Sequence, residues 1–183
     1  TGHMVFSTLH TNNAATSLPR LLDMGIEPFL IASTVHTVIG QRLVRRIAAD
    51  GKEAYQSDKT ETLAIQETLR GLLPEKEEDI AKVSEDLGYE SLPLIGQNAY
   101  TLYKGKDTRE TPGGYKGRLG LYEVFDVKEN IQDLIMKRAS SSDIQKAAQA
   151  NGMITMQQDG YLKALAGRTT LAEVNRVAAD DVA

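Results

Sequence analysis

The sequence contains no cysteine and no tryptophan, and aromatic residues make up only 5% of it. Without cysteine, the chain can form neither a disulfide framework nor a thiol-based catalytic or metal site. No apolar run approaches the roughly 20 residues that a membrane-spanning helix needs, so direct membrane insertion is not expected. No G-x-x-x-x-G-K-[ST] pattern occurs, so these residues hold no phosphate-cradling P-loop.

The chain also has no excess of positive charge. The chain has 21 lysine and arginine residues against 25 aspartate and glutamate residues, a net charge of -4. This balance, together with the low aromatic content, argues against a nucleic-acid partner. What is present is ordinary for a globular protein: 183 residues, 41% of them hydrophobic and 25% charged. This length predicts one domain or two small ones.

The beginning of the chain predicts a strand followed by a helix. Residues 4–9 form an apolar run that we interpret as a short buried strand. Asn12 or Asn13 could cap the helix that follows, which is expected to run to Met24.

The next apolar segment, residues 29–48, predicts a helix followed by a second strand. We expect the helix to continue to about Ile39, with Gly40 as the break and the strand at 41–47. The order strand, helix, helix, strand is typical of an α/β layer, so the predicted fold class is α/β.

The remainder is predicted to be mostly helical, with a short β module. Two residue pairs, Ser142 with Gln145 and Thr170 with Glu173, have the spacing of capping boxes at helix starts. Apolar spacing predicts helices at 63–72, 80–87 and from 131 onward, and strands at 100–103 and 118–127.

His10 lies where the first predicted strand ends, beside Thr11 and Asn12. In open α/β sheets, ligands bind outside the carboxyl ends of the strands, where an imidazole and a hydroxyl could contact phosphate or polarise a water. Alternatively, Thr11 and Asn12 cap the helix and His10 is a partly buried spectator. Spacing alone favours this second interpretation, and both stay open.

The other histidines and the arginines are less informative. His36 lies in an apolar segment, where a structural histidine is the simpler interpretation, and the histidines lack the carboxylate partners of a metal site. Arg42, Arg45 and Arg46 could meet phosphate or an acidic neighbour, or form a solvated charged face.

Four ordered motifs resemble one known family. The N-terminal "TGHMVFSTLHTNNAATSLPRLLDMGIEPFLIAST" resembles the histidine box of the secretion ATPase superfamily, the hexameric motors of type II secretion and type IV pilus assembly. The stretches "IGQRLVRRIA", "GYKGRLGLYEVF" and "QQDGYLKALAGRTTLAEVNRV" are similar to the C-terminal half of the same family. The resemblance covers nearly the whole chain, except the acidic segment at 74–92.

The resemblance implies the C-terminal part of a RecA-like ATPase core, followed by a mostly helical subdomain. Residues 1–48 would complete the RecA-like domain. Residues 49–127 would form a degenerate metal-binding-type subdomain with an acidic helical insertion, and residues 128–183 the C-terminal helical subdomain. In such motors the P-loop lysine and the catalytic glutamate lie upstream of the histidine box, so this fragment alone is expected to be inactive.

The resemblance also assigns site residues for a nucleotide, with ATP and Mg²⁺ as the cofactors of the parent protein. His10 matches the histidine that would approach the γ-phosphate or the attacking water, and is the candidate catalytic residue. The positions that match nucleotide-binding segments are His3, Thr11, Asn12, Gln41 and Arg42.

The chain departs from the family pattern in two ways. Asn13 stands where the family usually has an aspartate, which weakens any role for a carboxylate there. Many relatives bind structural zinc through two C-x-x-C pairs, and those four positions here are Ala48, Gly51, Asp107 and Glu110. Two carboxylates without sulfur or histidine make a poor zinc site, so no zinc is expected. Apolar packing is expected to replace it, through Leu102, Tyr115, Leu119 and Tyr122.

These observations predict part of an ATPase that powers type IV pilus assembly or type II secretion. The resemblance implies a homo-hexamer that moves an inner-membrane platform protein, in the cytoplasm and peripheral to the inner membrane. The alternative is a non-catalytic ring-forming or interaction module derived from such an ATPase. An intact P-loop in the upstream sequence would favour the motor.

Overall fold

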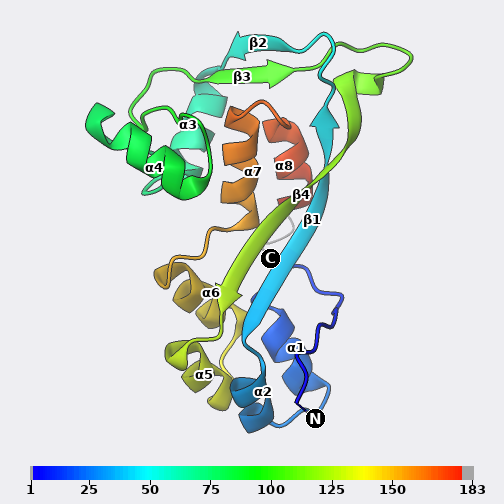
Figure 1. Cartoon of the computed structure of the whole chain (residues 1–183), viewed down its shortest axis with the longest axis vertical. Helices are drawn as coiled ribbons and strands as arrows, with labels where there is room; N and C mark the ends of the chain where they lie inside the picture. The colour runs from blue at the N-terminus through cyan, green and yellow to red at the C-terminus, as the bar shows by residue number, and fades with distance from the viewer. Residues whose placement is uncertain (1, 179–183) are drawn as a thin grey trace. The chain divides into compact units, whose positions relative to one another are not determined.

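The computed structural model describes residues 2–178, which form two compact units (Figure 1). Within these residues, the first unit comprises 2–41 and 122–155, and the second comprises 42–121 and 156–178. Two strands, β1 (Thr37–Ile47) and β4 (Tyr115–Asp126), pair with each other, and each contributes residues to both units.

The first unit packs four short helices around the ends of these strands (Figure 1). Helix α2 contacts α1 and α5, and α5 contacts α6. Ser140 caps α6, since its hydroxyl accepts from the Asp143 amide at 3.2 Å. The helices are α1 (Ser17–Asp23), α2 (Pro28–Thr34), α5 (Glu129–Met136) and α6 (Ser141–Ala150). The core buries one side of each helix, through residues that include Leu18, Ile31, Ile131, Ile135 and Ile144, together with Phe125 of β4.

The second unit combines a two-stranded antiparallel sheet with four helices in the described residues. Strands β2 (Glu53–Gln56) and β3 (Thr101–Lys104) pair antiparallel, with Glu53 opposite Lys104. The helices are α3 (Lys59–Thr68), α4 (Ile80–Leu87), α7 (Met156–Leu165) and α8 (Leu171–Ala178), with 3-10 turns η1 (Glu77–Asp79) and η2 (Pro112–Gly114). Helices α7 and α8 pack closely at Gly160, where an added Cβ would overlap the Val174 side chain. The core of this unit includes Val44, Ile65, Leu69, Tyr100, Leu121 and Leu162.

The predicted strand at residues 4–9 is wrong. Residues 2–10 form neither helix nor strand, and the side chains of Met4, Val5 and Phe6 are 81%, 79% and 90% exposed. A strand forms only where a neighbour accepts and donates its backbone hydrogen bonds. In residues 2–178, β1 pairs with β4 and β2 pairs with β3, and neither pair extends to this segment.

The boundary between the second helix and its strand is also corrected. Helix α2 ends at Thr34, and β1 already begins at Thr37, so the helix does not reach Ile39. Gly40 lies inside β1 as a buried residue and not as a break. Buried Val38 and Gly40 alternate with exposed Thr37 and Ile39, as expected for a strand. The sequence does not reveal this alternation, because buried Val38 and exposed Ile39 are both apolar.

Other predicted elements are confirmed with shifted ends. Helix α1 begins only at Ser17, after a turn that Asn13 stabilises. The box predicted at Ser142 is wrong, because the cap of α6 is Ser140. Thr170 does cap α8, through a 3.3 Å hydrogen bond from the Glu173 amide, but the Glu173 carboxylate binds Arg45 instead. The predicted helices at α3, α4 and α5 and the strands at β3 and β4 are present.

Candidate functional site

The two histidines assigned to a nucleotide site lie on the segment that precedes the first helix. His3 and His10 are both exposed, in a stretch without helix or strand. Within residues 2–178, neither histidine side chain has a hydrogen-bonded or ionic partner. An exposed imidazole without a partner is free to meet a ligand, and its removal should cost the fold little.

The residues after His10 form a turn that is held by its own side chains. The Thr11 hydroxyl donates to the Asn13 carbonyl oxygen at 3.0 Å and lies 3.2 Å from the Ser17 hydroxyl. The Asn13 side-chain oxygen accepts from the Thr16 amide at 2.9 Å and from the Thr16 hydroxyl at 2.6 Å. Such Asn and Thr side chains replace missing backbone bonds where a helix begins. Thr11 therefore holds the turn before α1 and does not cap the helix, because the N-cap of α1 is Thr16 and no side chain caps it. Asn13 acts as a hydrogen-bond acceptor for which no carboxylate is required.

A buried glutamate anchors this turn to β4. The Ala14 amide donates to Glu123 Oε1 at 2.6 Å, across 109 positions of the sequence. Glu123 is only 2% exposed, and Ala14 and Ala15 are fully buried. We call residues 10–17, with their anchor Glu123, the histidine turn.

The other predicted site residues lie elsewhere on the chain. Gln41 and Arg42 are in the middle of β1, where Gln41 is exposed and Arg42 is half-buried, and Asn12 is exposed within the histidine turn. The structure therefore places Thr11 and Asn12 in one turn with His10. It shows no such grouping for His3 or Gln41 within residues 2–178.

Sequence reasoning missed Glu123, although the sequence contains a signal for it. In β4, Leu121, Glu123 and Phe125 alternate with exposed residues, so the glutamate occupies a core position of the strand. A charged residue at a core position requires hydrogen-bonding partners, because an unpaired buried carboxylate is costly. That requirement marks Glu123 as a residue with a specific partner.

A second buried carboxylate, Glu173, binds one of the three arginines of β1. Arg45 Nε and Nη2 donate to Glu173 Oε1 at 2.9 and 2.6 Å, and the Arg45 amide donates to Oε2 at 2.9 Å. Arg176 adds a 3.0 Å bond to the same carboxylate. The Arg45 guanidinium also lies over the Tyr115 ring, 4.2 Å from its centroid. The sequence left open whether these arginines meet phosphate, an acidic neighbour or solvent. For Arg45, the structure shows an acidic neighbour, Glu173.

The positions aligned with zinc cysteines surround a tight backbone crossing. The Ala48 amide donates to the Gly114 carbonyl oxygen at 3.0 Å, and Asp107 accepts from the Gly113 amide at 3.0 Å. Gly105 and Gly114 approach so closely that a Cβ on either would overlap the backbone of the other. We call residues 105–114 the glycine corner.

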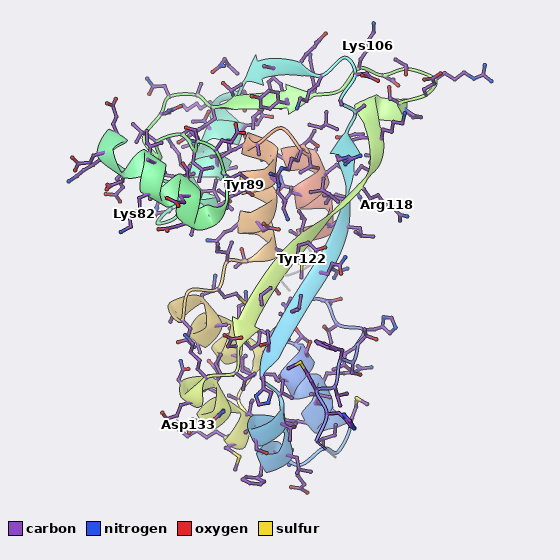
Figure 2. All side chains as sticks on the ribbon, viewed as in Figure 1. Lys82, Tyr89, Lys106, Arg118, Tyr122 and Asp133 are labelled. Atoms are coloured by element: carbon purple, nitrogen blue, oxygen red, sulfur yellow. The ribbon has the colours of Figure 1, made fainter. Side chains whose placement is uncertain are left out.

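Hydroxyl groups complete the glycine corner, which includes Lys106, labelled in Figure 2. Thr111, which is buried, donates to the Lys106 carbonyl oxygen at 2.8 Å and lies 2.7 Å from the Thr108 hydroxyl. The expected apolar replacement is only partly right. Leu102 is buried, but Tyr122 is 44% exposed and its side chain stands away from the ribbon (Figure 2).

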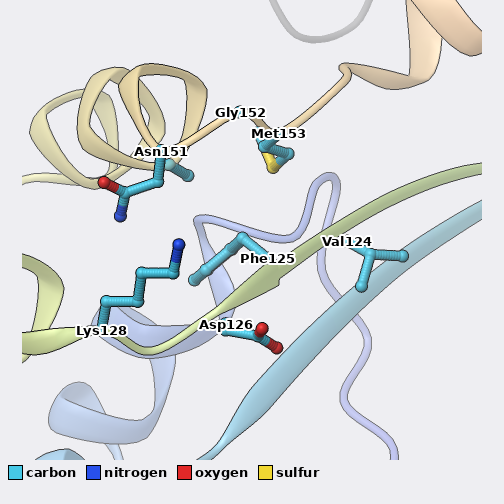
Figure 3. Close-up of a pocket in the computed structure, with 8 residues that line it drawn as sticks. Val124, Phe125, Asp126, Lys128, Asn151, Gly152 and Met153 are labelled. Carbon is cyan, nitrogen blue, oxygen red and sulfur yellow. The ribbon is translucent and has the colours of Figure 1, made fainter. Parts of the chain in front are cut away.

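One shallow hollow of about 140 Å³ lies in the first unit (Figure 3). Lys128 and Asn151 point toward one another across it, and the apolar side chains of Phe125 and Met153 line it. None of the predicted site residues lines this hollow. Its charged lining residues are Asp126 and Lys128.

Comparison with known proteins gives consistent results. The sequence profile of the family described as "Type II/IV secretion system protein" matches residues 1–176. The chain is 37% identical to the type II secretion system protein E of Xanthomonas campestris, covering 98% of this chain and 28% of the relative. It is 36% identical to the type IV pilus assembly ATPase PilB of Pseudomonas aeruginosa, covering 98% and 27%. It is 37% identical to the type II secretion system ATPase E of Vibrio cholerae, covering 97% and 30%. The chain thus spans less than a third of the length of these relatives.

Proposed function

Since this chain belongs to the type II/IV secretion system protein family, we propose that it is part of an ATPase that powers type IV pilus assembly or type II secretion. The observation that supports this proposal most is the family match over residues 1–176. This range includes the histidine turn and both strand pairs, β1 with β4 and β2 with β3. Within residues 2–178, no helix has the length and apolar character needed to cross a bilayer.

The proposed parent protein is a homo-hexamer with a RecA-like core that binds ATP and Mg²⁺. It acts in the cytoplasm at the inner membrane, where hydrolysis moves a platform protein. Phosphoryl transfer depends mainly on positioning and on charge stabilisation around the phosphates and Mg²⁺. The present residues would contribute His10 near the γ-phosphate or attacking water, with further contacts from His3, Thr11, Asn12, Gln41 and Arg42.

The geometry of the histidine turn is consistent with this role. Thr11 and Asn13 use their side chains to hold the turn, while His10 at its start is exposed and has no hydrogen-bonded or ionic side-chain partner among residues 2–178. A rigid turn that presents one imidazole resembles a sensor of a ligand held by another segment. The groups that would dominate nucleotide binding, P-loop amides and their lysine, have no matching pattern in this chain.

The test compares the full-length protein with this chain alone. Full-length protein should release phosphate from Mg·ATP steadily. The 183-residue chain should show no hydrolysis above buffer and no affinity tighter than about millimolar, because its residues supply only secondary contacts. Phosphate release and calorimetric titration measure both quantities.

Two results would overturn this proposal in different ways. Micromolar binding or steady turnover by the chain alone would show that the nucleotide site lies within these residues. A full-length protein that assembles but does not hydrolyse ATP would instead be a non-catalytic ring-forming module.

We also propose that the glycine corner is stable without zinc. Its aligned positions Ala48 and Gly51 carry no donor atoms, and Asp107 already accepts a backbone hydrogen bond. Purified protein should therefore contain substoichiometric zinc, and chelation should leave its melting temperature unchanged. For comparison, structural zinc contributes about 10 kcal/mol or more in zinc-finger peptides, so a real site would respond clearly. Stoichiometric zinc that survives mild chelation would contradict the expectation.

A further inference from the structure

We propose that Glu123 is a positioning residue for His10: its buried carboxylate holds the backbone of the histidine turn and thereby sets where the imidazole lies. This inference rests on the proposed ATPase function and assigns a role to a residue that the sequence motifs did not single out.

The first step of the argument is the environment of Glu123. The side chain is 2% exposed and sits on the inward face of β4, between Leu121 and Phe125, where an apolar residue would pack without penalty. Burying a carboxylate costs free energy unless hydrogen bonds compensate it. The short 2.6 Å bond from the Ala14 amide is one such compensation. A charge-assisted bond of this kind is about twice as strong as a neutral one.

The second step is what Ala14 needs. Ala14 is fully buried, so its amide does not reach bulk solvent and depends on an acceptor inside the protein. A buried amide that loses its partner costs about 1–3 kcal/mol. The turn would relieve that cost by moving its backbone toward another acceptor or toward solvent. Glu123 therefore determines the local conformation and not only the overall stability.

The third step connects Ala14 to His10. The Thr11 hydroxyl binds the Asn13 carbonyl oxygen, and the Asn13 side chain binds Thr16, so the residues between His10 and the helix move as one linked turn. The His10 side chain is exposed and has no hydrogen-bonded, ionic or ring partner that would fix it within residues 2–178. Its position thus depends on the turn, and the turn depends on the Glu123 anchor.

The consequence for catalysis follows from the sensitivity of enzymes to geometry. A misplacement of about 1 Å can cost on the order of 100-fold in rate. Glu123→Ala in the full-length protein should lower kcat for ATP hydrolysis by about 10- to 100-fold, while KM for ATP changes by less than about 3-fold. KM is spared because the main nucleotide contacts lie outside these residues.

Three variants separate positioning from general damage. Glu123→Gln keeps an oxygen at the same place and should restore most of kcat. Asp126→Ala is the matched control, because Asp126 is an exposed carboxylate of the same strand that accepts from the Thr37 hydroxyl at 2.8 Å. It should leave kcat within about 2-fold, as expected for an exposed substitution. The double variant His10→Ala with Glu123→Ala should be no slower than His10→Ala, since Glu123 acts through the histidine.

Amide hydrogen exchange of the full-length protein gives the structural readout. Peptides that cover residues 11–16 should exchange faster in Glu123→Ala and at the wild-type rate in Asp126→Ala. If Glu123→Ala does not fold, Glu123→Asp carries the test, because it keeps the charge and withdraws the oxygen by one methylene. A folded variant lacking the Glu123 anchor that has wild-type kcat, or additive losses in the double variant, would overturn the inference. A wild-type protein without hydrolysis would overturn the proposed function itself.

Discussion

Replacing His10 with alanine in the full-length protein should slow ATP hydrolysis by about 10- to 1,000-fold, the loss typical of removing one proton-transfer group or one transition-state donor. The melting temperature should not change, because the His10 side chain is exposed and has no partner within residues 2–178. Steady-state kinetics with Mg·ATP and a thermal melt of the same preparation measure the two effects together.

His36 provides the matched control for this experiment. It is also an exposed histidine of the first unit, and its backbone carbonyl, which a substitution preserves, accepts from the Val127 amide. His36→Ala should hydrolyse ATP at the wild-type rate. Normal hydrolysis together with a collapse of stability in His10→Ala would instead support the spectator interpretation of the histidine.

Replacing Glu173 with alanine should lower the free energy of unfolding by about 3 kcal/mol, at the lower end of the range for breaking a buried ion pair. The substitution removes the acceptor for Arg45 and Arg176 and leaves the Arg45 amide without its partner. The loss is limited because both arginine side chains are more than half exposed and can be hydrated. Urea unfolding measures it. The matched control is Glu67→Ala on the exposed face of α3, expected within about 0.5 kcal/mol of the wild type.

The same carboxylate makes part of the stability depend on pH. Burial alone would raise the pKa of Glu173, but hydrogen bonds from Arg45 and Arg176 outweigh it and lower the pKa from 4.5 to about 2. The unfolded chain therefore binds this proton at higher pH than the folded chain. The contribution is fully present above about pH 4.5 and disappears as the pH falls toward 2. Glu173→Gln should reduce the loss of stability across this window. An unchanged slope would show that other carboxylates dominate acid unfolding.

The elements that sequence reasoning found are those with strong local signals. Helices α3, α4 and α5 have apolar residues at helical spacing, and β4 has an alternating pattern. All four elements could therefore be predicted without knowledge of the fold. The strand prediction for residues 4–9 was wrong for a non-local reason. An apolar run forms a buried strand only if another strand lies beside it, and none does within residues 2–178. The predicted end of α2 was wrong because a continuous apolar run shows no clear change of period between a helix and the strand that follows it.

The exposed residues proposed for the site could be selected from the sequence, whereas the residues that support them could not. His10, Thr11 and Asn12 are neighbours in the sequence, so a motif could identify them. Glu123 lies 109 residues from the amide it binds, and Glu173 lies 128 residues from Arg45. Contacts at such separations depend on how strands and helices pack. Local propensity carries no information about them, although a charge at a core position indicates that some partner exists.

The glycine corner has a consequence for how substitutions are tolerated there. A site held by thiolates and a metal constrains its ligands and leaves the residues between them variable, whereas a crossing of two backbones constrains every atom at the point of contact. At Gly105 and Gly114 even the smallest side chain is excluded, and the Thr108 and Thr111 hydroxyls do the joining. The chain has no cysteine for peroxide to oxidise. On the proposal that the corner is stable without zinc, zinc starvation should leave it intact. The corner is therefore sensitive to mutation, since any substitution of Gly105 or Gly114 adds a Cβ atom where no space exists.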